Sequence, residues 1–218
     1  QLALMLAEAR DVARADASVK AGGWRKEFPG SRIEVAGRTV GMVGFGHVGA
    51  AFARRLSGFG CRLLAYDPYA PASSLRAAGV APVSALDEVF RSADFVVVQA
   101  RHSRETDRFI GAAQFALMRP GAYFVNVSRS RVVDMAALFA ALSSGAIAGA
   151  GLDVFDEEPL PADSPWRSLD NLTVTTHFGG DTEETSRTSA ALVADAVAEY
   201  AWTGRVAAAV NAAELGWR

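Results

Sequence analysis

The segment from Thr39 to Leu56 constrains the fold more than any other part of the chain, because it reads TVGMVGFGHVGAAFARRL. A short apolar run is followed by glycines at the spacing G-x-G-x-x-G, and then by an alanine-rich run that favours a helix. Gly44 allows a tight turn, Gly46 lets a ligand approach the backbone, and Gly49 lets the helix pack closely on the strand. The pattern predicts a strand–turn–helix unit that holds the pyrophosphate of a dinucleotide.

Residues around this turn narrow the predicted ligand to NAD. Backbone amides near His47 and Val48 lie at the start of the helix, where the helix dipole attracts an anion. Asp67 follows Gly49 by 18 residues, close to the roughly 20 expected for a carboxylate that binds ribose hydroxyls. No arginine or lysine follows it directly, which favours NAD over NADP. Two plainer interpretations stay open: glycines that serve only packing, and an aspartate that only opens the turn into Pro68.

Short apolar runs alternate with helix-forming runs from residue 39 onward. Apolar strands separated by helices indicate a parallel sheet covered on both faces, so we predict an α/β fold with a doubly wound, Rossmann-type sheet. The predicted strands are residues 39–43, 62–66, 95–99, 123–126, 149–153 and 172–176. The predicted helices are residues 2–20, 48–56, 86–91, 112–118, 135–143 and about 183–202, and residues 21–37 are predicted to form a loop.

Composition and charge exclude several classes of partner. The formal net charge is −2 and the isoelectric point is about 6.0, so no basic surface for nucleic acid is expected. No apolar run approaches the roughly 20 residues that would span a bilayer, so we expect no membrane partner. The apolar run after Gln1 has no basic region before it, and we interpret it as a buried helix rather than a signal peptide. Cys61 is the only cysteine, which excludes an internal disulfide and favours a cytoplasmic location.

Three histidines are candidates for proton transfer: His47, His102 and His177. His47 lies in the glycine turn, where a side chain faces outward, and His102 lies in a loop that follows a predicted strand. His177 directly follows the predicted strand at 172–176. Ligands of open parallel sheets bind beyond the carboxyl ends of the strands, so His177 is the histidine best placed for chemistry.

Two further strand ends carry charged side chains. Arg129 follows the predicted strand at 123–126, and Glu157 and Glu158 follow the strand at 149–153. An arginine presents a planar fork to a carboxylate, and a histidine accepts a proton from a hydroxyl group. An acid beside the histidine orients the imidazole and favours its charged form. Such a set would serve hydride transfer from a hydroxy acid to a dinucleotide.

At this point the sequence resembles the D-isomer-specific 2-hydroxyacid dehydrogenases, because GRTVGMVGFGHVG, LMRPGAYFVNVSR, SGAIAGAGLDVFDEEP and TTHFGG match in order. The resemblance spans essentially the whole chain and implies an NAD-dependent dehydrogenase. It implies that Arg129 binds the substrate carboxylate, that His177 is the acid/base and that Glu158 is the partner of that histidine. Asp153 resembles the residue that contacts the nicotinamide carboxamide. The other cofactor contacts that the resemblance implies are Ala100, Thr106, Val127, Ser128, Arg129, His177, Gly179 and Gly180.

The same resemblance implies how the chain is divided. Residues 1–37 would form a connecting helix and loop, 38–181 the dinucleotide-binding domain, and 182–218 a return helix and tail toward a substrate domain. In the family, part of that substrate domain precedes the helix that begins here, so we expect it to be largely absent from this chain. A homodimer, no metal ion and a small 2-hydroxy or 2-keto acid substrate are expected.

Other functions stay open beside this one. Family relatives that act on phosphoglycerate or phosphite keep the arginine, the glutamate and the histidine. Formate dehydrogenases fit less well, because they have glutamine where Glu158 stands. An alternative from a different class is an NAD-sensing, corepressor-like binding protein, in which the nucleotide is a signal for dimerisation.

The sequence departs from the family pattern at two places. Ser130 and Arg131 follow Arg129, where the family has two small residues, commonly glycines. Arg131 either adds a cation near the site or forms an ion pair elsewhere, so the identity of the substrate stays open. Gln99 and Ala100 stand in the loop where the family has His-x-Pro, which affects packing on the adenine side.

Overall fold

The computed structural model describes residues 1–24 and 32–217. Part of the loop predicted at 21–37 therefore lies outside the described residues. The chain divides into two compact units, Gln1–His177 and Phe178–Arg218, which are described separately here.

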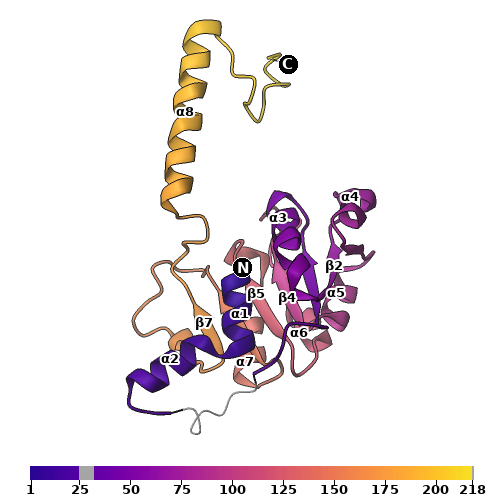
Figure 1. Cartoon of the computed structure of the whole chain (residues 1–218), viewed down its shortest axis with the longest axis vertical. Helices are drawn as coiled ribbons and strands as arrows, with labels where there is room; N and C mark the ends of the chain where they lie inside the picture. Colours follow the sequence, from indigo (N-terminus) through magenta and orange to yellow (C-terminus); the bar gives the residue numbers. More distant parts are fainter. Residues whose placement is uncertain (25–31, 218) are drawn as a thin grey trace. The chain divides into compact units, whose positions relative to one another are not determined.

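The first unit is built on a parallel sheet, which confirms the predicted fold class (Figure 1). Its seven described strands run in the order β3-β2-β1-β4-β5-β6-β7. The chain leaves β1 toward β2 and later returns to β4 on the other side of β1, so the strand order reverses there. In doubly wound sheets this reversal opens a crevice at the carboxyl ends of the strands. The strands are β1 Thr39–Val43, β2 Arg62–Tyr66, β3 Ala81–Pro82, β4 Phe95–Val98, β5 Tyr123–Asn126, β6 Gly149–Leu152 and β7 Leu172–Val174.

Helices cover both faces of the sheet. Their bounds are α1 Leu2–Arg10, α2 Val12–Lys20, α3 His47–Leu56, α4 Ala72–Ala77, α5 Leu86–Ser92, α6 Ala112–Leu117 and α7 Met135–Ser143, with 3-10 turns at Ser57–Phe59, Ser130–Val132 and Pro165–Ser168. Along β4, Val96 and Val98 join one apolar cluster with α5, α6 and α7, whereas Phe95 and Val97 join another with α1, α3 and α4. All four side chains are fully buried. This period of two is what a strand buried on both faces requires.

The single helix predicted at 2–20 is wrong, because the chain breaks at Asp11 into α1 and α2. Asp11 has a φ of 55°, a left-handed conformation that aspartate tolerates better than most residues. Leu4 and Met5 of α1 are buried against the sheet, whereas α2 has no buried residue. The break therefore lets the first half of the apolar run enter the core while the second half lies at the surface.

The remaining differences between the predicted and the observed elements involve only a few residues each. The structure adds α4 and β3, which span six and two residues and are too short to give a periodic signal. Three predicted strands end one or two residues earlier than expected, so Gln99 and Asp153 follow their strands rather than ending them. Those two residues consequently belong to the loops at the carboxyl edge of the sheet.

The second unit contains the long helix α8, Glu183–Thr203, as predicted to within one residue. Thr182 caps its first turn by accepting a hydrogen bond from the amide of Thr185 at 3.0 Å. Gly204 ends it in the left-handed conformation, with a φ of 67°. Over the part of the chain that is described, no helix is both long enough and apolar enough to cross a membrane.

Candidate active site

The glycine turn between β1 and α3 has the backbone that its sequence predicts. Gly44 has a φ of 95°, and a side chain there would lie 2.8 Å from the backbone nitrogen of Ala100. Glycine is therefore required twice, once by the backbone conformation and once by the close approach of the loop that follows β4. The backbone of Ala100 therefore lies beside the glycine turn, and its contact with a cofactor stays a prediction.

Gly46 and Gly49 have opposite surroundings, which fit the two different roles predicted for them. Gly46 is the N-cap of α3, and a Cβ built on it would meet no described heavy atom within 4 Å. A Cβ on Gly49 would collide with the side-chain oxygen of Gln99 and lie 3.2 Å from the carbonyl oxygen of Gly44. The turn is thus packed on its inner side and open at the N-terminus of a ten-residue helix, whose first residues His47 and Val48 are exposed. An open cradle of amides at a helix start fits the pyrophosphate of NAD.

Asp67 joins the end of β2 to the glycine turn. Its Oδ2 accepts a hydrogen bond from the amide of Phe45 at 2.6 Å. Its Oδ1 accepts from the amides of Tyr69 and Ala70 at 2.9 and 3.0 Å. Asp67 therefore does shape the turn into Pro68, and it does so at the edge of the crevice. Because each carboxylate oxygen has two lone pairs, these bonds leave acceptor capacity for ribose hydroxyls.

The loop that follows β4 is held by Thr106. The hydroxyl of Thr106 accepts a hydrogen bond from the amide of Ser103 and donates one to the carbonyl of Arg101, both at 2.7 Å. His102, in the same loop, contacts Asp107 through Nε2 at 2.8 Å. That hydrogen bond lowers the pKa of Asp107. His102 therefore has an acidic partner of its own, separate from Glu158.

A buried asparagine shapes the loop that carries Arg129. Asn126, at the end of β5, is fully buried, and its side chain donates to the carbonyl of Arg129 at 3.0 Å. Its Oδ1 accepts from both the amide and the hydroxyl of Ser128 at 3.0 Å. Half-buried Val127 lies between them, and Arg129 itself is exposed, with Nη1 donating to the Ser128 carbonyl at 2.7 Å. Asn126 was not among the predicted site residues, although a polar residue that ends a buried strand is a recognisable signal.

The predicted acid–histidine pair is formed. Glu158 Oε2 lies 2.7 Å from Nδ1 of His177, and Oε1 of the same carboxylate accepts from the amide of Phe155 at 2.8 Å. Partial burial opposes ionisation of Glu158, but the hydrogen bonds from His177 and Phe155 and the imidazolium charge outweigh it, so its pKa is lowered. A carboxylate bound to Nδ1 directs Nε2 away from itself, which leaves that nitrogen available for proton transfer.

Asp153 directly follows β6, at the carboxyl edge of the sheet. It is 2% exposed and accepts a hydrogen bond from the hydroxyl of Thr175 at 2.5 Å. Arg129, Asp153 and His177 thus follow β5, β6 and β7, which are neighbours in the sheet. Gly179 and Gly180 belong to the second unit, so their predicted contacts with the cofactor stay predictions.

Arg131 lies toward the loop that follows β4. Its carbonyl accepts a hydrogen bond from the amide of Arg108 at 2.7 Å, and both arginine side chains help to lower the pKa of Asp107, after the larger effect of His102. Over the described residues, neither arginine forms an ion pair within 4.0 Å.

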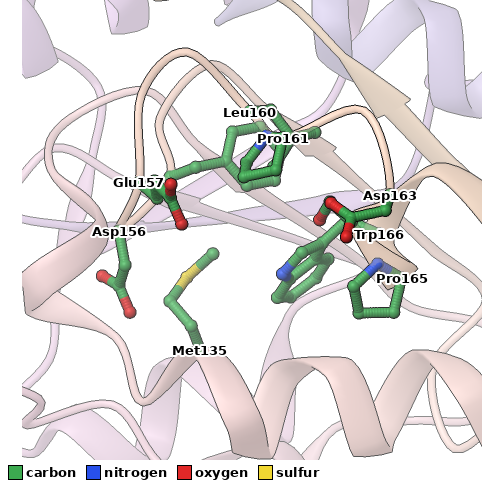
Figure 2. Close-up of a pocket in the computed structure, with 10 residues that line it drawn as sticks. Met135, Asp156, Glu157, Leu160, Pro161, Asp163, Pro165 and Trp166 are labelled. Atoms are coloured by element: carbon green, nitrogen blue, oxygen red, sulfur yellow. The ribbon is translucent and has the colours of Figure 1, made fainter.

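A pocket of about 360 Å³ lies on the loop that follows β6 (Figure 2). It is lined by Met135, Phe155, Asp156, Glu157, Leu160, Pro161, Asp163, Ser164, Pro165 and Trp166. None of the three predicted catalytic residues lines it, because Glu158 is bound to His177 instead. Among the described residues, no group of three or more histidine, cysteine or acidic side chains could hold a metal ion.

Comparison with known proteins agrees with this geometry. A family model described as "D-isomer specific 2-hydroxyacid dehydrogenase, NAD binding domain" matches residues 2–179. D-3-phosphoglycerate dehydrogenase of Methanocaldococcus jannaschii is 40% identical over 197 residues, which are 90% of this chain and 37% of that protein. Glyoxylate reductase of Korarchaeum cryptofilum is 41% identical over 196 residues, which are 88% of this chain and 59% of that protein.

The fold is also similar to that of solved structures. The holo form of D-mandelate dehydrogenase from Rhodotorula graminis matches with a TM-score of 0.85 and 31% identity, over 91% of this chain and 60% of that one. The chain therefore spans between 37% and 60% of the length of these three proteins. The family model covers most of the chain. The chain belongs to the D-isomer-specific 2-hydroxyacid dehydrogenases, of which it carries the NAD-binding domain.

Proposed function

We propose that the chain supplies the NAD-binding half of a dehydrogenase that interconverts a D-2-hydroxy acid and its 2-keto acid. The contact of Glu158 with His177, at 2.7 Å, is the observation that carries this proposal. An exposed histidine with an ionised acid on Nδ1 is suited to move a proton through Nε2. The pair lies at the same edge of the sheet as the open glycine turn, where a dinucleotide and a substrate would meet.

Arg129, His177 and Glu158 have different roles in the proposed reaction. Bound NAD supplies a nicotinamide ring that accepts a hydride from C2 of the hydroxy acid. Arg129 binds the substrate carboxylate through its planar guanidinium, which fixes C2 beside the cofactor. Nε2 of His177 accepts the proton of the 2-hydroxyl as the C–O bond becomes a carbonyl. Glu158 stabilises the resulting imidazolium, and the reverse reaction returns the proton to the oxygen.

The proposed dinucleotide-binding domain comprises residues 38–181. Within it, the amides at the start of α3 bind the pyrophosphate and Asp67 binds the ribose hydroxyls. The buried carboxylate of Asp153 would accept a hydrogen bond from the nicotinamide carboxamide. Ala100, Thr106, Val127 and Ser128 would complete the walls of the crevice. Arg131 is left out of this set, because its charge helps to lower the pKa of Asp107, in the loop that follows β4.

The substrate is proposed as a small 2-hydroxy or 2-keto acid, with phosphoglycerate and phosphite as alternatives. D-3-Phosphoglycerate dehydrogenases and glyoxylate reductases are among the relatives at about 40% identity. This favours a small 2-keto acid or phosphoglycerate over phosphite. We further propose a homodimer in the cytoplasm. Val12, Val19 and Trp24 are 50–66% exposed on and after α2, and a second copy would cover them.

The proposal is tested by turnover of the intact protein. We expect NADH oxidation with members of a panel that contains glyoxylate, pyruvate, longer 2-keto acids and 3-phosphohydroxypyruvate. Sedimentation velocity with and without NAD should give a dimer in both conditions. Dimerisation that depends on NAD, together with no turnover on any substrate, would instead support the corepressor-like alternative.

The glycine turn gives a second, independent test. We expect Gly46→Val to raise the Kd of NAD at least about tenfold, because the side chain would fill the space through which the pyrophosphate approaches the amides. The melting temperature should stay close to that of the native protein, because a Cβ at this position meets no described atom within 4 Å. Calorimetric titration with NAD measures the affinity.

Gly58→Ala is the matched control for this variant. A Cβ on Gly58 also meets no described atom within 4 Å, but Gly58 lies in the 3-10 turn Ser57–Phe59, after the far end of α3. The control should bind NAD normally. Normal binding by Gly46→Val would show that the pyrophosphate does not use this turn.

A further inference from the structure

A hydrogen bond between side chains crosses the mouth of the nucleotide crevice. The hydroxyl of Tyr69, in the loop that follows β2, donates to Oε2 of Glu105, in the loop that follows β4. β2 and β4 are the two neighbours of β1 in the sheet, so these loops flank the glycine turn on either side. The contact therefore spans the carboxyl end of β1, next to Asp67, which directly follows β2.

Glu105 and Asp67 are bound in different ways. Asp67 accepts hydrogen bonds from three backbone amides, which disperse its charge. The described contact of the Glu105 carboxylate is with the neutral hydroxyl of Tyr69, and no described cation lies within 4.0 Å of it. Arg104 precedes Glu105 and is exposed, but it forms no such ion pair.

Both Glu105 and Asp67 affect the pKa of the Tyr69 hydroxyl. The hydrogen bond and the charge of Glu105 raise the pKa of the Tyr69 hydroxyl, and the charge of Asp67 raises it further. The phenol thus stays a neutral donor that holds Glu105 in place. Asp67 accepts a hydrogen bond from the amide of Tyr69, and Glu105 accepts one from its hydroxyl. The two acidic groups therefore contact the same residue, beside the place where the sequence predicts the adenosine ribose.

We propose that Glu105, oriented by Tyr69, is a specificity-determining residue that disfavours a dinucleotide with a phosphate on its adenosine ribose. This inference rests on the proposed NAD site and adds a second carboxylate to the discrimination expected from Asp67. A ribose phosphate carries about −1.5 to −2 charges at neutral pH, so it is repelled by any unpaired carboxylate within a Debye length of roughly 8–10 Å. Free ribose hydroxyls meet no such penalty.

Two variants separate the charge of Glu105 from its position. Glu105→Gln keeps an oxygen that accepts from Tyr69 but removes the charge, whereas Tyr69→Phe keeps the charge and removes the bond that holds it. We expect Glu105→Gln to lower the Kd of NADP about three- to tenfold, with the Kd of NAD changed less than about twofold. Tyr69→Phe should give a smaller change in the same direction. Calorimetric titration of the intact protein with each nucleotide measures both affinities without turnover.

Glu34→Gln is the control, because it removes the same charge from a side chain that is 83% exposed and is paired with Arg10 instead. The gain in NADP affinity should be lost at about 0.5 M salt, where the Debye length is shorter. An NADP/NAD affinity ratio in Glu105→Gln within twofold of the native ratio would overturn the inference, as would an equal gain in Glu34→Gln. Native NADP binding as tight as NAD binding would also overturn it, because Arg104 would then dominate. Failure of the native protein to bind NAD would overturn the proposed function as well.

Discussion

Arg129→Ala and His177→Ala should each lower kcat/KM of the intact protein for a 2-keto acid by about 100- to 10,000-fold. Arg129 is expected to fix the substrate carboxylate, and loss of that fork removes the alignment of C2 with the cofactor. His177 is expected to move the proton, and alanine leaves no group at that position to do so. NAD binding should survive in both variants, with a Kd within about threefold of native, because the glycine turn and Asp67 carry most of that affinity. Steady-state kinetics and calorimetric titration give the two quantities.

The chain offers a matched control for each of these variants. Arg131→Ala removes an exposed arginine two residues from Arg129 whose backbone is tied to Arg108. His102→Ala removes a histidine that, like His177, contacts a carboxylate, here Asp107 at 2.8 Å. Both controls should keep kcat/KM within a few-fold of native. Near-native rates in Arg129→Ala and His177→Ala would refute the proposed mechanism, and a large loss in Arg131→Ala would place a second cation at the substrate.

The parts of the fold that could be predicted are those with a repeating pattern. The strands β1, β2 and β5 were predicted at their observed bounds. β1 and β5 are fully buried and largely apolar, whereas β2 is only partly buried but is apolar from Leu63 onward. The break between α1 and α2 could not be predicted in this way, because alanines favour a helix on both sides of Asp11. The break depends on the burial of Leu4 and Met5 against the sheet, which is a tertiary contact.

The candidate site, like the fold, could be predicted only in part. Arg129, Glu158 and His177 could be placed at one edge from the sequence, because parallel strands bring their carboxyl ends together. The orientation of Asn126 toward the Arg129 loop depends on hydrogen bonds that only the folded loop reveals. The contact between Tyr69 and Glu105 joins loops that are 36 residues apart, and no spacing rule links them. The proposed reacting groups could thus be named from the sequence, whereas the side chains that hold their loops could not.

Glu8→Gln should make the protein progressively more stable than the native form as the pH rises. Glu8 of α1 is fully buried, its Oε1 accepts from the hydroxyl of Thr173, and its Oε2 has no hydrogen-bond partner among the described residues. Burial raises its pKa from 4.5 to about 7, against the lowering effects of Thr173 and the Arg14 charge. The unfolded chain therefore ionises Glu8 at a lower pH than the folded chain does. The stability present below pH 4.5 is lost as the pH rises toward 7, and the amide variant, which does not titrate, escapes that loss.

The difference in unfolding free energy between Glu8→Gln and the native protein should grow by about 2–3 kcal/mol from pH 5 to pH 8. Urea unfolding at the two pH values measures it, and any constant cost of fitting the amide beside Gly149 cancels from the comparison. Glu157→Gln, at an exposed position on the loop after β6, should show no growth over the same range. A Glu8→Gln difference that is equal at both pH values would mean that Glu8 is ionised in the folded protein. Burial of the acid against β6 and β7 would then be compensated by Arg14, rather than by protonation.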